Sequence, residues 1–88
     1  MKLSDWIART LEERLQPTRL AVLDESDQHI GHGGWREGGE THFRIDIVSE
    51  AFSGKSRVER HRLVNDALKS AFERGLHALA IQAKAPGE

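Results

Sequence analysis

The sequence has 88 residues, and its 13 lysines and arginines against 14 aspartates and glutamates give a formal net charge of −1. This length predicts one small domain over residues 1–88, with a core too modest for a deep enzymatic cleft. The near-zero charge disfavours a general nucleic-acid binder, and the absence of cysteine excludes disulfides, thiol catalysis and cysteine-only metal sites. No apolar run approaches the roughly 20 residues that span a bilayer, and residues 1–9 have no apolar leader, so we expect a cytoplasmic protein without membrane contact.

The first half of the chain predicts a helix, a strand and a loop. Ser4 is a suitable helix N-cap, and Pro17 ends the helix because proline disfavours helical geometry in the residue before it. Between them, apolar residues recur at helical spacing, at Trp6, Ile7, Leu11 and Leu15. Residues 20–23 are typical of a short buried strand. Residues 31–39 hold five of the eight glycines, which predicts a loop.

The second half predicts a strand, a helix and a further strand. Residues 41–48 have the alternating period of a half-buried strand, whose apolar side carries Phe43, Ile45 and Ile47. Ser56 and Glu59 have the spacing of a capping box, so a helix is expected to begin there. It runs to Gly75, a natural left-handed stop, through Val58, Leu63, Val64, Ala67, Leu68, Ala71 and Phe72. Residues 77–83 form the last strand.

The predicted fold class is α+β, in the order helix, strand, strand, helix, strand. Two helices can cover one face of a three-stranded mixed sheet and bury its apolar side. The strand–helix–strand half requires a crossover connection, which makes the second and third strands parallel. We therefore expect a sheet with one antiparallel pair and one parallel pair.

No pattern of residues in this chain predicts catalysis. The serines occupy predicted caps and turns, and none has the surroundings of an activated nucleophile. No glycine-rich loop leads into the Lys-Ser or Lys-Thr pair that cradles a phosphate in nucleotide-binding proteins. We therefore expect a protein that is not an enzyme.

Histidine is the residue in excess, with five copies. His29 and His32 form a His-x-x-His pair in or beside the glycine loop, and His77 opens the last strand. If that strand lies beside the second one, the loop and His77 could meet at one end of the sheet. Imidazole binds zinc, copper and iron near neutral pH, although simple exposure to solvent is the alternative for all three. His42, on the polar side of its strand, and His61, on a helix, suit buried or salt-bridged roles.

Basic residues gather at the start of the second predicted helix: Lys55, Arg57, Arg60 and Arg62. A helix N-terminus with several cations suits a phosphate group or an acidic partner surface. The alternative is a solvated face that Glu59 and Asp66 partly neutralise. Trp35, within the glycine loop, is expected to contact a partner or to fold back over the sheet.

Six short motifs together resemble the BolA family. Each is weak alone, but jointly they are specific, and they occur in the order and spacing of the family over residues 20–84. The first helix is less distinctive. The motifs are Asp24–His29, Gly31–Gly33, Gly39–Phe43, Phe52–Gly54, Arg60–Val64 and Leu76–Leu79.

The resemblance implies a fold similar to the class II KH topology and no enzymatic activity. BolA-like proteins pair with monothiol glutaredoxins of the Cys-Gly-Phe-Ser type, and the pair can share a [2Fe-2S] cluster. At the matching positions His77 is the shared ligand, and His29 matches the loop ligand best, with His32 as the alternative. A glutaredoxin cysteine and glutathione would supply the sulfur ligands, so the absence of cysteine is expected for one half of such a site. Imidazole in place of thiolate raises the potential of a cluster, as in Rieske centres.

The resemblance also implies an alternative function. Some members of the family are described as transcriptional regulators. The KH-like topology, together with the basic residues between Lys55 and Arg62, makes DNA binding the second hypothesis. The net charge of −1 weakens it.

Overall fold

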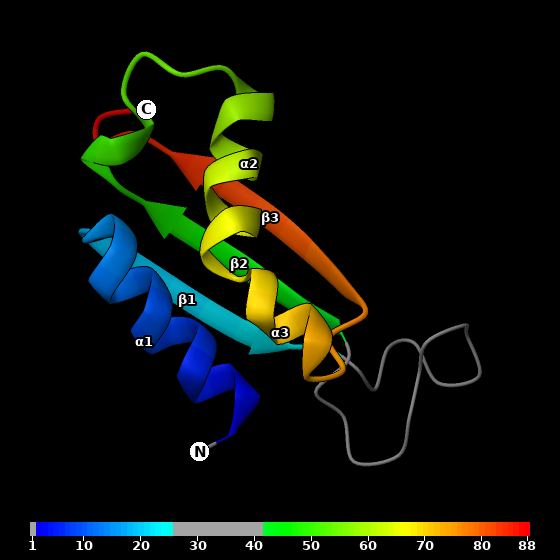
Figure 1. Cartoon of the computed structure of the whole chain (residues 1–88). Coiled ribbons are helices and arrows are strands. Elements are labelled where there is room, and N and C mark those ends of the chain that lie inside the picture. The colour runs from blue at the N-terminus through cyan, green and yellow to red at the C-terminus, as the bar shows by residue number, and fades with distance from the viewer. Residues whose placement is uncertain (1, 26–41) are drawn as a thin grey trace.

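The alternating segment in the middle of the chain forms the central strand of the sheet. The computed structural model describes residues 2–25 and 42–88. Strand β2 (His42–Val48) pairs antiparallel with β1 (Arg19–Asp24) and parallel with β3 (Ala78–Lys84), so the strand order is β1-β2-β3 (Figure 1). The predicted three-stranded mixed sheet, with its second and third strands parallel, is confirmed.

The core lies between one face of this sheet and two helices. Phe43, Ile45 and Ile47 of β2 are buried, as their alternation predicts. Helices α1 (Leu3–Leu15) and α2 (Arg57–Ala67) cover this face, with α1 over β1 and α2 towards β3 (Figure 1). The opposite face carries exposed residues from all three strands, among them Arg19, Leu23, Arg44 and Gln82. The predicted α+β layering is therefore confirmed. The prediction that residues 20–23 form a buried strand is wrong, because β1 is an edge strand whose residues are exposed or half-buried.

The first helix begins earlier than its sequence predicts. Helix α1 starts at Leu3, and the Trp6 N–H donates to the Lys2 carbonyl oxygen at 3.0 Å, so Lys2 occupies the N-cap position. The prediction that Ser4 is the cap is wrong, because the helix begins one residue earlier, at Leu3, and Ser4 already lies inside its first turn. The predicted end is confirmed: the helix stops at Leu15, and Gln16 adopts a left-handed conformation before Pro17.

The second helical segment begins as predicted. A short 3₁₀ helix, η2 (Glu50–Phe52), precedes it and buries Phe52. The Ser56 hydroxyl then accepts from the Glu59 N–H, and the Glu59 carboxylate accepts from the Ser56 N–H, which completes the capping box.

The single helix expected up to Gly75 is divided in two. Helix α2 ends at Ala67 and α3 (Lys69–Glu73) follows, with Leu68 between them in a non-helical conformation. Gly75 has a φ of 108°, so the predicted left-handed stop is present.

Two apolar residues of this segment, Val58 and Phe72, are exposed. The buried stripe consists of Val64, Ala67, Leu68 and Ala71. Val58 lies about 240° around α2 from Val64, at about 100° per residue, and therefore faces solvent. Phe72 lies on α3, beyond the break at Leu68, and is also exposed.

Candidate functional site

Three strand ends converge at one end of the sheet. Asp24 of β1 is opposite Phe43, and His42 of β2 is opposite Ala78 of β3. Strand β1 therefore ends where β2 and β3 begin (Figure 1). The chain leaves this end at Glu25 and returns at His42. The predicted convergence of the connection with the start of the last strand is confirmed.

A pair of histidines occupies this end of the sheet. His77, immediately before β3, is exposed, whereas His42 is only 6% exposed. Their ring centroids are 5.2 Å apart and the rings are inclined by 55°, so the imidazole of His77 packs against that of His42. The expectation of a buried role for His42 is confirmed, although its sequence position did not reveal its neighbour.

Polar contacts support the backbone beside this pair. The Glu25 N–H donates to the His42 carbonyl oxygen at 2.8 Å, and Arg44 Nε donates to Glu25 Oε2 at 3.1 Å. A hollow of about 120 Å³ lies between Glu25, His42 and residues 78–80 of β3. The start of β2 is thereby held against the end of β1, beside the first residues of β3.

The described residues provide few ligands at this end. Within residues 2–25 and 42–88, no group of three or more histidine, cysteine, aspartate or glutamate side chains could hold a metal ion. His77 is exposed and available to an atom from outside. The other candidates, His29, His32 and Trp35, lie outside the described residues.

The predicted basic residues divide between two hollows. A groove of about 480 Å³ is lined by Lys55, Arg57, Arg60 and His61 and by residues 81–84 of β3. Arg62 instead borders a smaller hollow of about 180 Å³, together with Glu59 and Asp66. Lys55 borders both hollows, so Arg62 shares a hollow with Lys55 but not with Arg57 or Arg60.

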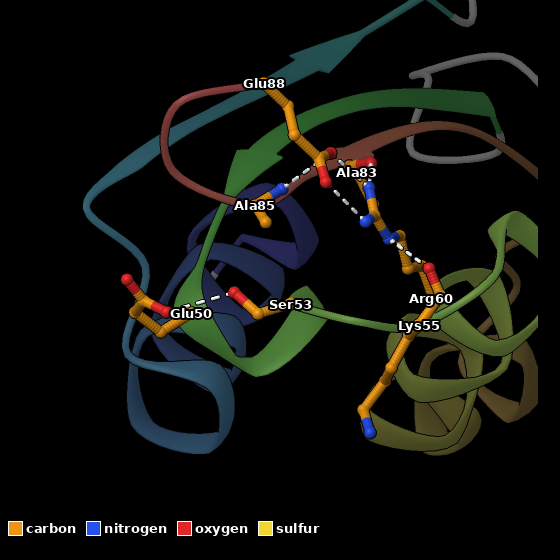
Figure 2. Close-up of polar contacts among 7 residues, drawn as sticks. All are labelled: Glu50, Ser53, Lys55, Arg60, Ala83, Ala85 and Glu88. Carbon is orange, nitrogen blue, oxygen red and sulfur yellow. Dashed lines mark hydrogen bonds and ion pairs between the residues drawn. The ribbon is translucent and has the colours of Figure 1, made fainter.

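Arg60 has an acidic partner that the sequence did not reveal. Its Nη1 and Nη2 donate to the two carboxylate oxygens of Glu88, with a distance of 2.7 Å for the Nη2–Oε2 pair (Figure 2). Arg60 and the N–H of Ala85 together lower the pKa of Glu88 to about 2. The same pairing raises the pKa of Arg60. The expected partial neutralisation by Glu59 and Asp66 concerns Lys55 and Arg62, which border the same hollow, whereas Arg60 pairs with Glu88.

The comparison with protein families decides the identity of this fold. The family model described as BolA-like protein matches residues 11–88. The chain belongs to the BolA-like family. A Sinorhizobium protein described as "Uncharacterized protein in cobS 5'region" is 52% identical over 89 residues, covering 100% of this chain and 96% of its own length. The solved BolA domain of SufE1 from Arabidopsis thaliana superimposes with a TM-score of 0.88 and 49% identity, covering 98% of this chain and 94% of that chain.

Other BolA-like relatives differ in length and name. A Vibrio cholerae protein named "DNA-binding transcriptional regulator BolA" is 42% identical over 79 residues, covering 90% of this chain and 71% of its own length. The chain spans only 23% and 50% of two Arabidopsis thaliana relatives, SufE-like protein 1 and BOLA1, both named as organellar proteins. In the part of the chain that the structure describes, no helix is long and apolar enough to cross a membrane. The cytoplasmic location stays a prediction.

Proposed function

We propose that this BolA-like protein is a non-enzymatic partner of a monothiol glutaredoxin of the Cys-Gly-Phe-Ser type, with which it shares a [2Fe-2S] cluster. His77 is the ligand from the described part of the chain. His29 is the second ligand, with His32 as its alternative. The pair acts in iron-sulfur cluster assembly and trafficking or in iron-dependent regulation, and this chain contributes the imidazoles that would hold the cluster.

The exposed ring of His77 at the convergent end of the sheet carries this proposal. The ring lies at the start of β3, beside the points where the chain leaves β1 and enters β2. The connection between these points contains His29 and His32. A histidine from this connection therefore starts from the same end of the molecule as His77, although the two are far apart in sequence.

The ligand chemistry of the chain fits one half of a shared site. The sequence contains no cysteine, so this chain provides nitrogen ligands only. A [2Fe-2S] cluster needs four protein or thiol ligands, and two imidazoles can occupy one iron, as in Rieske centres. The other two ligands must come from outside, and a glutaredoxin cysteine with glutathione supplies them. His42 packs behind His77 and limits where its ring can turn.

The visible spectrum of the co-purified pair tests the first proposal. The two proteins, expressed together with iron and glutathione, should give visible absorbance and circular dichroism unlike those of the glutaredoxin homodimer. His77→Ala should abolish this difference, because it removes an iron ligand. His61→Ala, on the half-buried helical histidine, should preserve it.

Two further variants identify the second ligand. His29→Ala should change the spectrum and His32→Ala should leave it unchanged; the reverse result would make His32 the ligand. A spectrum that is the same with and without His77 would contradict the proposed site.

DNA binding is the second candidate function. The name of the Vibrio cholerae relative and the basic groove formed by Lys55, Arg57 and Lys84 favour it. Binding through phosphate contacts would weaken steeply with salt, by a slope of about 0.9 per neutralised phosphate. A gel shift at low salt that disappears with added salt would support this candidate, and its complete absence would remove it.

A further inference from the structure

The basic groove contains a guanidinium that the backbone already holds in place. Arg60 Nε donates to the Lys55 carbonyl oxygen at 3.0 Å, and Nη1 donates to the Ala83 carbonyl oxygen at 3.3 Å (Figure 2). Both acceptors are main-chain atoms, one just before α2 and one on β3. These two bonds do not depend on Glu88. The guanidinium therefore keeps its position whatever group occupies the outer side of its fork.

The outer side of that fork is occupied by the carboxylate of Glu88. Two parallel N–H donors meet its two oxygens, the geometry in which arginine binds carboxylate and phosphate groups. Glu88 Oε1 also accepts the N–H of Ala85 at 3.1 Å. The Glu88 side chain is 44% exposed and the Arg60 side chain only 14%. The carboxylate can therefore depart into solvent while the guanidinium stays covered.

The groove around Arg60 carries more positive charge than one glutamate carboxylate can neutralise. Lys55, Arg57 and Lys84 line the same groove of about 480 Å³, and His61 borders it. Among the described residues that line this groove, none is acidic. The space and the charge suit a group with two or more negative charges, because each further cation attracts it and a single carboxylate cannot neutralise them all.

We propose that this groove binds an oxyanion, a phosphate or carboxylate group of a ligand, and that Glu88 is a built-in competitor which the ligand displaces from Arg60. The pKa of Glu88, about 2, keeps its carboxylate charged at neutral pH, so competition opens the site and protonation does not. The contacts of Arg60 carry this inference, which is independent of cluster binding at His77.

A titration of the full chain with inorganic phosphate at pH 7, followed by amide NMR shifts, tests the proposal. Glu88→Gln should bind phosphate about threefold or more tightly than the wild type, because it removes the competing charge. The Ala83 and Lys55 amides should shift in both proteins. In the wild type, phosphate should also shift the Ala85 amide, because displacement of Glu88 removes the carboxylate oxygen that accepts its N–H.

One variant controls for the change of charge, and another tests the contribution of a groove cation. Glu73→Gln, on an exposed residue of α3, changes the same charge away from the groove and should bind phosphate as the wild type does. Arg57→Gln should weaken binding about threefold in either background, since it removes a cation that lines the groove. A parallel titration with succinate shows whether phosphate or carboxylate is preferred. Equal phosphate affinity in the wild type and Glu88→Gln, or an equal gain in Glu73→Gln, would overturn the proposal.

Discussion

Ile45 shows how a local pattern decides the surroundings of one residue. It is fully buried at the centre of β2, opposite Val22 on β1 and Ile81 on β3, and all three face the helices. Because side chains alternate between the two faces of a strand, the two-residue hydrophobic pattern predicts that Ile45 lies on the face covered by the helices. His42 obeys the same period and belongs to the opposite face. Its burial comes instead from its place at the strand end, against His77.

Truncation of Ile45 should therefore be costly. Ile45→Ala should lower the free energy of unfolding by about 2–5 kcal/mol, because it removes buried methyl groups and leaves a cavity between the sheet and the helices. Leu23→Ala, at an exposed apolar residue of β1, should change it by less than about 0.5 kcal/mol. Urea denaturation measures both. Equal losses for the two variants would show that the face assignment is wrong.

Ser49 joins three elements at the end of the sheet opposite the histidine pair. Its buried hydroxyl donates to the carbonyl oxygen of Leu15, the last residue of α1, and accepts the N–H of Ala51 in η2 at 3.1 Å. Its own N–H donates to the Lys84 carbonyl oxygen of β3 at 2.9 Å. The hydroxyl thus satisfies a carbonyl that the helix end leaves without an intrahelical donor. One side chain therefore sets how α1 meets the sheet.

Loss of this hydroxyl should separate the helix end from the sheet. Ser49→Ala should lower the free energy of unfolding by about 1–3 kcal/mol, because it leaves a half-buried carbonyl and a half-buried N–H without the partner that the buried hydroxyl supplied. Ser53→Ala is the matched control: its hydroxyl donates to the Glu50 carboxylate at 3.0 Å, but both side chains are exposed (Figure 2). Its cost should stay below about 0.5 kcal/mol in thermal or urea unfolding. A similar cost for both variants would contradict the role of Ser49.

For the whole molecule, two carboxylates with lowered pKa values make the stability of the fold depend on pH at the acidic end. The Arg60 pairing and the Ala85 N–H lower the pKa of Glu88 to about 2, and hydrogen bonds with the Ser56 backbone and side chain lower that of Glu59. In the unfolded chain both return towards the ordinary glutamate value. Their contribution to stability is therefore present above that value and is lost as the pH falls.

Acid unfolding of the wild type should show this loss. The free energy of unfolding should decrease between about pH 4.5 and pH 2, as Glu88 protonates in the unfolded chain before it does in the folded one. Glu88→Gln should show a shallower decrease over the same range, and Glu73→Gln should follow the wild type. Circular dichroism during denaturation at several pH values measures the slopes. Parallel curves for all three proteins would exclude a stabilising pair between Arg60 and Glu88.

Local patterns were enough to predict the order of the elements and the covered face of β2, but not the break at Leu68 or the exposure of Val58 and Phe72. Alternation, the capping box and the stops at Pro17 and Gly75 are local, because each depends on residues a few positions apart. The parallel pairing of β2 and β3, and hence the approach of His77 to the returning chain, followed from the rules of connection. The two proposed loop ligands lie outside the described residues, so their positions stay predictions.

The tertiary structure alone decided which distant side chains meet. Arg60 and Glu88 are 28 residues apart, and Ser49 and Leu15 are 34 apart. His42 and His77 belong to different elements whose ends meet only in the folded sheet. Periodicity predicts which face of an element a residue occupies. It does not predict the exact strand register, the helix break at Leu68 or the turn after β3. Those features depend on packing between elements, and they decide that Arg60 faces Glu88 while Arg62 faces the other hollow.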